Sequence, residues 1–232
     1  MELREFLSHE DFRFSEEKLT KLFLLADTVL EWNEHINVTA IKDRQEFIQK
    51  NIIDSLCLGH LDQFQQARTV LDIGTGGGFP GLPLAVVFPE KKFYLNDTIG
   101  KKLKVVSDTA QKLGLSNVEV VHARAEDLAR DKNFRESFDV VTSRAVANMS
   151  TLSEYCIPFV KKGGYFLAFK TNDSMEEIEA AAHAFQLLKA EKQAVVSDGI
   201  EGSGHNFVII RKTGETPAKY PRKAGTPSKE PL

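Results

Sequence analysis

The stretch VLDIGTGGGFPG, residues 70–81, decides the fold of this 232-residue chain, because a short apolar strand in it breaks into a glycine-rich loop that opens a helix. Glycines in such a loop accept positive φ values and carry no side chain that would keep a ligand from the backbone. Pro80 suits the first helical turn, where its missing N–H costs nothing. The stretch therefore predicts a strand–loop–helix unit that brings backbone close to a nucleotide-like ligand.

Two classes of ligand use this unit. The spacing Gly76-x-Gly78-x-x-Gly81 fits the dinucleotide pattern, although one such match is weak. In the other register Asp72 precedes a G-x-G-x-G run that begins at Gly74, which is typical of S-adenosylmethionine (SAM) methyltransferases. Backbone donors and the helix dipole suffice for a pyrophosphate, whereas a carboxylate at position 72 would lie near the ammonium group of SAM. Asp72 therefore favours SAM, and NAD remains the alternative.

A second apolar run, residues 93–95, ends in Asn96 and Asp97. If this strand is a parallel neighbour of the first, Asp97 lies beside the glycine loop. An acid at that place can bind the paired hydroxyls of a ribose. Asp72, Gly74, Gly76 and Asp97 are therefore candidate cofactor-binding residues.

Strands and helices alternate after Arg68. Five apolar runs are predicted as strands: 69–73, 92–96, 118–122, 138–143 and 165–170. Helical segments such as 101–113 and 151–160 separate them, which predicts a mostly parallel sheet covered on both faces. The runs 189–196 and 206–211 have no helix between them and predict an antiparallel hairpin joined by a glycine-rich loop. The expected fold is α/β, a seven-stranded Rossmann-like sheet of the class I SAM methyltransferase type, because dehydrogenases lack this closing hairpin.

The chain is expected to have three parts. Residues 1–66 predict an N-terminal helical cap, in which Ser15 is an N-cap residue and Asp43 begins a capping-box spacing. Residues 67–212 are the expected SAM-binding core, and residues 213–232 a basic C-terminal arm.

The end of the chain is basic while the remainder is acidic. From Arg211 onward six basic residues stand against two acidic ones, although the net charge of the whole chain is −3. A basic arm on an acidic body suggests a polyanionic partner. Residues 216–232, with several prolines and little apolar content, predict either a docking arm or a disordered tail.

Composition places the chain among globular enzymes. Its 42% of apolar residues can supply one sizeable core. Cys57 and Cys156 are too few for a disulfide framework or a zinc cluster, which favours a reducing compartment. The chain shows neither a signal profile nor an apolar run near the roughly 20 residues that cross a bilayer. We expect a cytoplasmic protein without membrane association, and a monomer because nothing suggests an obligate dimer.

Ligands of open parallel sheets bind beyond the carboxyl ends of the strands. Phe79 follows the first strand, and Ala125 and Glu126 follow the third at the start of a helix. An adenine needs an apolar slot with polar contacts to its edge, which the backbone of Ala125 and the side chain of Glu126 can supply. Phe79 can pack on the ligand. Core packing for Phe79 and helix capping for Glu126 are the alternatives.

Two cations also follow strands. Arg144 ends a run too apolar for a surface strand, so its charge must face water, a partner or an anion. Lys170 ends the next strand in the same way. A guanidinium can stack on an unstacked base or donate to its acceptor edge, and a structural ion pair is the alternative. The histidines form no pair with metal-ligand spacing, so we expect no metal. No catalytic Ser-His-Asp order can be argued either, so we expect no covalent nucleophile.

Six segments carry a resemblance to a known family: WNEHINVTAI (32–41), IIDSL (52–56), LDIGTGGGFPGLPLA (71–85), RAED (124–127), FDVVTSRA (138–145) and YPRKAGTP (220–227). With them the chain resembles the bacterial 16S ribosomal RNA guanine-N7 methyltransferases, the family called RsmG, GidB or glucose-inhibited division protein B. The segments run from the first quarter of the chain to its carboxyl end. The chain departs from the family pattern at Asn51, where relatives usually carry His, and at Thr171, where they commonly carry Gly.

The resemblance implies transfer of a methyl group from SAM to N7 of one guanine in the decoding-region loop of 16S rRNA. The expected partner is that rRNA or the small ribosomal subunit. SAM contacts are implied at Gly74, Phe79, Ala125, Glu126 and Arg144. We assign Arg144 and Lys170 to contacts with the base and phosphates, and Asn37 and Asp54 to the frame of the pocket. An NAD-dependent oxidoreductase and a non-catalytic ribosome-assembly factor that binds RNA are the alternatives.

Overall fold

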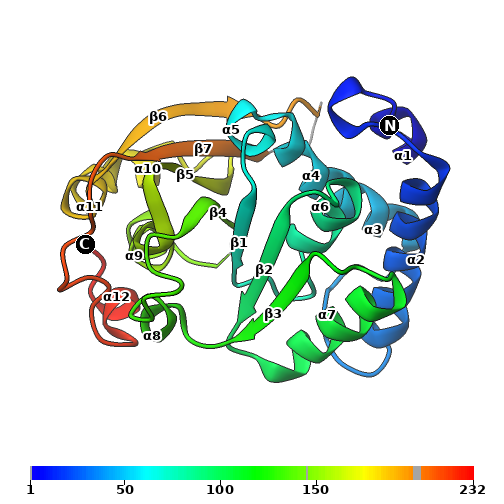
Figure 1. The fold of residues 1–232 in the computed structure, drawn as a ribbon, viewed down its shortest axis with the longest axis horizontal. Coiled ribbons are helices and arrows are strands. Elements are labelled where there is room, and N and C mark those ends of the chain that lie inside the picture. The colour runs from blue at the N-terminus through cyan, green and yellow to red at the C-terminus, as the bar shows by residue number, and fades with distance from the viewer. Residues whose placement is uncertain (1, 145, 201–204) are drawn as a thin grey trace.

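A seven-stranded sheet crosses the molecule, with strand order β3-β2-β1-β4-β5-β7-β6 (Figure 1). This computed structural model describes residues 2–144, 146–200 and 205–232; Ala145 and part of the predicted glycine-rich loop, residues 201–204, lie outside them. The parallel strands are β1 (Thr69–Ile73), β2 (Lys92–Asp97), β3 (Val118–His122), β4 (Phe138–Arg144) and β5 (Val160–Thr171). The antiparallel strands are β6 (Ala190–Ser197) and β7 (His205–Lys212). The predicted mostly parallel sheet with its antiparallel closing pair is confirmed.

The strand order reverses at β1, which lies between β2 and β4. In open α/β sheets the crevice beyond the carboxyl ends of the strands at such a point is the usual ligand site. Ile73 of β1 aligns with Asn96 of β2, so the glycine loop after β1 lies beside Asp97 at the same edge. The sheet topology thus brings the strand-end residues together.

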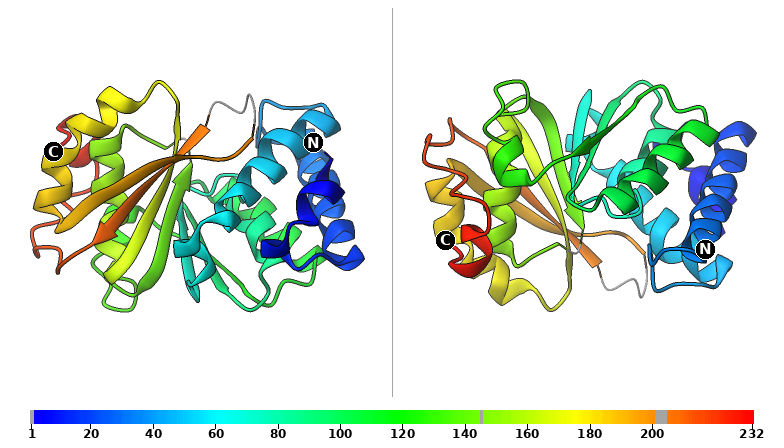
Figure 2. Two further views of the ribbon diagram at one scale, coloured as in Figure 1. Left: turned by 90° about the horizontal axis from the view of Figure 1, so that it is seen from above. Right: turned by 90° about the horizontal axis from the view of Figure 1, so that it is seen from below.

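Helices cover both faces of the sheet, as Figure 2 shows from above and below. The cap comprises α1 (Leu3–Leu7), η1 (Glu10–Phe12), α2 (Glu16–Asn33), α3 (Arg44–Phe47), η2 (Ile48–Ile53), α4 (Asp54–Leu56), η3 (Cys57–His60) and α5 (Asp62–Gln65). It packs on α6 (Gly81–Val87) and α7 (Gly100–Lys112). The opposite face carries α8 (Ala125–Leu128), α9 (Met149–Cys156), η4 (Ile157–Phe159), α10 (Met175–Ala180), α11 (Ala182–Leu187) and α12 (Thr226–Lys229).

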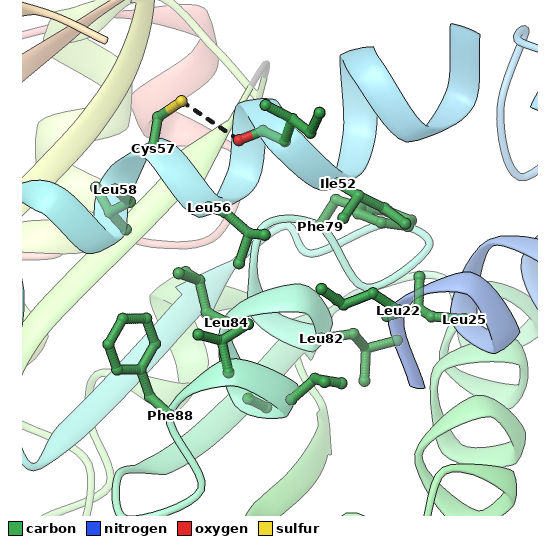
Figure 3. Packing of buried hydrophobic residues seen from close by; sticks show 14 of the residues in the cluster. Leu22, Leu25, Ile52, Leu56, Cys57, Leu58, Phe79, Leu82, Leu84 and Phe88 are labelled. Carbon is green, nitrogen blue, oxygen red and sulfur yellow. Dashed lines mark hydrogen bonds between the residues drawn. The ribbon is translucent and has the colours of Figure 1, made fainter. Parts of the chain in front are cut away.

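The cap and the sheet share one apolar core. Leu22 of α2, Ile52 of η2 and Leu82 of α6 are fully buried and belong to the same cluster (Figure 3). Burying a leucine or isoleucine side chain contributes about 1.5–3 kcal/mol. These contacts fix the cap against the helix that follows the glycine loop, and so determine which cap residues reach the strand ends.

The predicted helix starts in the cap are confirmed, but the second helix is not regular. Ser15 caps α2 by accepting the N–H of Lys18 at 3.2 Å, and Asp43 caps α3 by accepting the N–H of Glu46 at 2.8 Å. After four residues α3 widens into the π-helix η2 and then tightens into α4. Such π segments often occur at functional sites, and this one carries Asn51.

One other helical expectation differs from the structure. The helix predicted for residues 151–160 ends at Cys156, because Pro158 cannot continue a helix and a 3-10 turn follows. Between Lys170 and Lys189, a segment for which no element was predicted, lie α10 and α11.

The C-terminal arm is docked, so the disordered alternative is wrong. Tyr220 and Pro227 are buried. Arg222 pairs with the fully buried Glu154, Nη2 lying 2.7 Å from Oε2. Lys212 likewise pairs with Glu136, whose Oε1 lies 2.9 Å from the lysine Nζ. Two of the cations that the sequence analysis counted toward a polyanionic partner are therefore neutralised inside the fold.

In the described part of the chain no helix combines the length and apolar character that crossing a membrane requires.

Candidate active site

The glycine loop is held by the neighbouring strand. The N–H groups of Gly74 and Thr75 both donate to the carbonyl of Asn96 at 2.9 Å. Gly74 has φ +72°, and a Cβ at this position would collide with Cγ2 of Val146. Gly76 has φ +58°, and a Cβ there would meet nothing within 4 Å. At Gly74 the loop thus packs closely against Val146, which follows β4, whereas space is free beside Gly76.

Asp72 organises the loop from within. It is fully buried, and its Oδ2 accepts the hydroxyl of Thr75 at 2.7 Å and the N–H of Gly81 at 3.0 Å. Its Oδ1 is buried and has no hydrogen-bond partner among the described residues. Burial raises the pKa of Asp72 to about 7, against the hydrogen bonds from Thr75 and Gly81, which lower it. The sequence placed this carboxylate near the ammonium of SAM, and the unpartnered Oδ1 is the atom that could fill that role.

Asp97 lies beside the loop, as the parallel pairing predicts. Its Oδ2 accepts the N–H of Gly76 at 2.9 Å, and its Oδ1 accepts the N–H of Ile99 at 2.8 Å. Each carboxylate oxygen has a further lone pair. Asp97 therefore fixes the turn after β2 and can still accept hydrogen bonds from ribose hydroxyls.

Glu126 binds the C-terminal arm in this structure. Ala125 and Glu126 begin α8 directly beyond β3, and both are buried. Oε1 of Glu126 accepts the N–H of Gly225 at 2.9 Å. The contact of Glu126 with adenine stays a prediction, and its visible role is to hold the arm over the end of β3.

Phe79 lies between the loop and the cap. Its ring contacts the ring of Phe47, and the guanidinium carbon of Arg144 lies 5.8 Å from its centroid. Phe79 is 7% exposed. The core packing that the sequence left open is therefore present, and a contact of Phe79 with the ligand stays a prediction.

Asn37 lies on a cap loop that touches the glycine loop. The side chain of Asn33 shapes this cap loop by accepting the N–H groups of Val38 and Thr39, both at 2.9 Å. Val38 packs against Gly77, where a Cβ would collide with its Cγ1. Asn37 itself is exposed and lines a groove of about 920 Å³. Within the described residues, Asn37 makes no hydrogen bond to the other predicted catalytic residues.

Arg144 is bound to the cap. Its Nη1 donates to Oδ2 of Asp54 at 2.8 Å and to the carbonyl of Lys50 at 3.1 Å. Its Nη2 donates to Oδ1 of Asn51 at 2.8 Å. The structure thus joins Arg144 and Asp54, two predicted catalytic residues that are 90 positions apart. It also gives Asn51 a role that the sequence did not suggest.

Asp54 has a second partner, His205. Nδ1 of His205 lies 2.8 Å from Oδ1 of Asp54, which is 4% exposed. The hydrogen bond to Asp54 raises the pKa of His205, while burial opposes this. Asp54 therefore lies between a guanidinium on β4 and an imidazole at the start of β7. Antiparallel pairing of Thr171 with His205 is what places this imidazole at the strand ends.

Lys170 is paired as well. Its Nζ lies 2.6 Å from Oε1 of Glu177 and 2.9 Å from the carbonyl of Ala147. Glu177 belongs to α10, the helix that the sequence pattern did not indicate. A pocket of about 220 Å³ joins the two cations and the imidazole; its lining comprises Arg144, Phe169, Lys170, Thr171, Ser174, Glu177 and His205.

The residues at the glycine loop fit SAM. The open space above Gly76 admits a ligand against the backbone. The unpartnered Oδ1 of Asp72 is an acceptor for a cationic group, and Asp97 accepts at the next strand end. Asp72, Gly74, Gly76 and Asp97 come together here, whereas Asn37 lies on the cap side and Lys170 two strands away.

The expectation of no metal rested on sequence spacing alone. Among the described residues two groups of three ligand-type side chains have their ligand atoms within 4.8 Å of one another. One group is Asp54, Asp198 and His205, and the other is His9, Asp11 and His60. Sequence spacing could not reveal them, because each group joins segments that are far apart along the chain.

Comparisons with known proteins agree with this geometry. A family described as GidB, rRNA small subunit methyltransferase G, matches residues 18–205. Ribosomal RNA small subunit methyltransferase G of Clostridium perfringens is 44% identical over 221 residues, covering 94% of this chain and 92% of that protein. The protein of that name from Oceanobacillus iheyensis is 42% identical over 228 residues, covering 97% and 96%.

Solved structures share the fold at low sequence identity. The ribosomal protein L11 methylase of Lactobacillus delbrueckii has a TM-score of 0.52 at 13% identity, covering 75% of this chain and 81% of that one. The fibrillarin pre-rRNA processing protein of Methanococcus jannaschii has a TM-score of 0.52 at 16% identity, covering 64% and 67%. With the sheet order, these likenesses confirm the predicted class of fold.

Proposed function

The chain belongs to the rRNA small subunit methyltransferase G family, and on this premise we propose that it transfers the methyl group of SAM to N7 of one guanine in the decoding-region loop of 16S rRNA. The observation that carries the proposal is the family match over residues 18–205, which includes the glycine loop and both strand-end cations. The alternatives, an NAD-dependent oxidoreductase and a non-catalytic assembly factor, gain no support from that match.

The reaction requires alignment more than proton transfer. When bound, SAM supplies an electrophilic methyl group on a sulfonium centre. Guanine N7 has a free lone pair at neutral pH, so no side chain has to remove a proton. The rate can then come from orientation and from exclusion of water, and a chain without a dedicated general base is consistent with this chemistry.

The cofactor side of the site consists of residues on the first three strand ends. Asp72 and Asp97 would accept hydrogen bonds from the ammonium and the ribose, and Gly74 and Gly76 would let the backbone approach. Phe79, Ala125 and Glu126 would border the adenosine, and Arg144 would lie between cofactor and substrate.

The substrate side consists of Arg144 and Lys170, framed by Asn37 and Asp54. A guanidinium has five N–H donors, and Arg144 donates three hydrogen bonds to the cap. It can therefore donate to the acceptor edge of guanine while its position is held by Asp54. Lys170 would exchange Glu177 for a phosphate. In paired A-form RNA N7 lies in a groove too deep for side chains, so the target guanine is expected to be unpaired.

A labelling experiment tests the proposal. Small ribosomal subunits from a strain that lacks the gene are incubated with the purified chain and methyl-labelled SAM. Label is expected in their 16S rRNA and not in the 23S rRNA of large subunits from the same strain, incubated in the same way, and small subunits from the parent strain should accept none because their site is already methylated. Absence of label from 16S rRNA, or a thermal shift with NAD and none with SAM, would contradict it.

Three finer points belong to the same proposal. We expect the enzyme to act as a monomer in the cytoplasm, and to divide into the cap, core and arm at residues 66 and 212. Sedimentation at the protein concentration of the assay tests the first point. Limited proteolysis tests the division: the chain should be cut near the exposed Gln66, whereas the buried Lys212 in β7 should be protected as long as the arm stays docked.

A further inference from the structure

Two histidines converge on one carboxylate at the N-terminal edge of the cap. Asp11 lies in η1, and His60 is the last residue of η3. Oδ2 of Asp11 lies 2.6 Å from Nδ1 of His60 and 3.1 Å from Nδ1 of His9. The two imidazole rings meet edge to face with centroids 4.6 Å apart. Their nitrogen atoms thus face the same oxygen.

The three side chains present atoms of the kind that bind metal ions. A neutral imidazole carries one N–H, and its other nitrogen presents a lone pair. With the N–H on Nε2, Nδ1 of His9 and Nδ1 of His60 present lone pairs toward Oδ2 of Asp11, at 3.1 and 2.6 Å. In that tautomer the three atoms can bind one metal ion together.

The ligand-bearing turns are built rigidly. The His60 ring is packed edge-on against Phe6 and Phe12, with centroids 5.4 and 4.7 Å away. Nε2 of Gln65 donates to the carbonyl of Asp11 at 3.4 Å and to the carbonyl of Gly59, which ties η1 to η3. Close approach of these turns depends on Gly59, because a Cβ there would lie 2.7 Å from Cε1 of Phe12.

We propose that His9, Asp11 and His60 bind a zinc ion. Two imidazoles and one carboxylate form a ligand set that zinc accepts at distances of about 2.0–2.2 Å, with a fourth position left for water. The three ligand atoms already lie within 4.8 Å of one another, so small side-chain rotations complete the geometry. A pocket of about 410 Å³, which His9 and His60 help to line, provides access for the ion and its water.

The ion would fasten the N-terminal segment to η3, which directly follows α4 and its Asp54. Binding to the folded state alone stabilises that state by mass action. The site lies outside the cluster of Arg144, Lys170 and Asp97, so zinc would act on stability rather than on methyl transfer.

Zinc titration of the full chain tests the proposal. Tag-free protein is stripped with EDTA, freed of chelator and titrated with ZnCl₂ near pH 7, followed by calorimetry and by thermal unfolding. One equivalent should bind and raise the Tm. Cobalt(II) should give the intense visible absorption of a four-coordinate ion, which reports the site without any activity assay.

Variants locate the ion. H9Q is the primary variant because His9 is 54% exposed in its side chain, so its replacement should not unfold the protein. D11N is the second, and both should weaken zinc binding at least about tenfold. H183N, at an exposed histidine on α11, should bind as wild type does. No binding by wild type, or binding that survives both H9Q and D11N, would overturn the proposal. In the second case the cluster of Asp54, Asp198 and His205 would be tested next.

Discussion

At the scale of single residues, Gly74 decides whether the cofactor loop can form. Its φ of +72° strains any other residue, and a Cβ would collide with Val146 across the strand ends. We expect G74A to lower the affinity for SAM at least about tenfold, measured by calorimetry, because the whole loop must shift. Gly114 offers a matched control, since its φ is +64° and a Cβ there meets nothing within 4 Å. G114A should cost about 1 kcal/mol of stability and leave SAM affinity unchanged; equal affinities in the two variants would contradict this expectation.

Asp72 should make stability depend on pH. Its folded-state pKa is about 7 against an ordinary value of 3.8, so between these values the folded chain binds a proton that the unfolded chain has lost. The contribution of Asp72 to the free energy of unfolding is therefore highest at low pH, and it falls as the pH rises from about 4 to about 7. D72N keeps an acceptor for Thr75 and Gly81 but cannot ionise.

Urea unfolding of wild type and D72N at several pH values checks this prediction. The difference between the two proteins isolates Asp72, because His205 and the other titrating groups contribute to both. We expect the free energy of unfolding of D72N to increase relative to that of wild type as the pH rises toward the folded-state pKa of about 7. A difference independent of pH would show that Asp72 is ionised throughout.

At the scale of elements, the contact between the π-helix η2, α4 and β4 joins the cap to the core. Asp54 is 6% exposed in its side chain and binds Arg144 and His205 with its two oxygens. Removing one charge of a buried pair leaves its partners uncompensated, so D54N should lose about 3 kcal/mol of stability. It should also lower the pKa of His205, which an NMR titration of the ring can follow.

The exposed pair of Arg4 and Glu16 supplies the control for D54N. E16Q removes an ion pair whose members are 59% and 66% exposed, and it should leave both stability and the pKa of His205 unchanged. An unchanged His205 pKa in D54N would mean that the imidazole takes its charge from another group.

At the scale of the whole molecule, charge is divided between pairs inside the fold and cations on the surface. Arg222 forms an ion pair with Glu154, whereas Lys219, Lys223 and Lys229 are exposed on the arm. Replacing these three lysines by glutamine should flatten the dependence of rRNA affinity on salt. The slope of log K against log salt should change by about 0.7 for each phosphate that the arm no longer binds.

R222Q should affect stability and not RNA binding. Its free energy of unfolding should fall, because Glu154 is fully buried and would lose its partner, whereas the dependence of rRNA affinity on salt should stay unchanged. Filter binding between low and moderate salt measures both variants. A slope unaltered in the triple lysine variant would exclude the arm from RNA binding.

The sequence predicted those features that depend on neighbours along the chain. The glycine loop, the seven strands and the caps at Ser15 and Asp43 follow from local patterns of apolar residues, turns and hydrogen-bonding side chains. The pairing of charges did not follow, because the partners of Arg144 and Lys170 come from η2 and α10. The sequence left a docked and a disordered arm as alternatives, because the few apolar residues of the arm, Tyr220 above all, are buried only against the folded core.

The most direct test of the central claim is to map N7-methylguanosine along 16S rRNA by chemical cleavage, which breaks the chain at that nucleotide. We expect one cleavage in the decoding-region loop when the gene is present, its loss when the gene is deleted, and its return with the wild-type gene but not with a gene encoding G74A. A cleavage that persists after deletion would contradict the proposed methyl transfer.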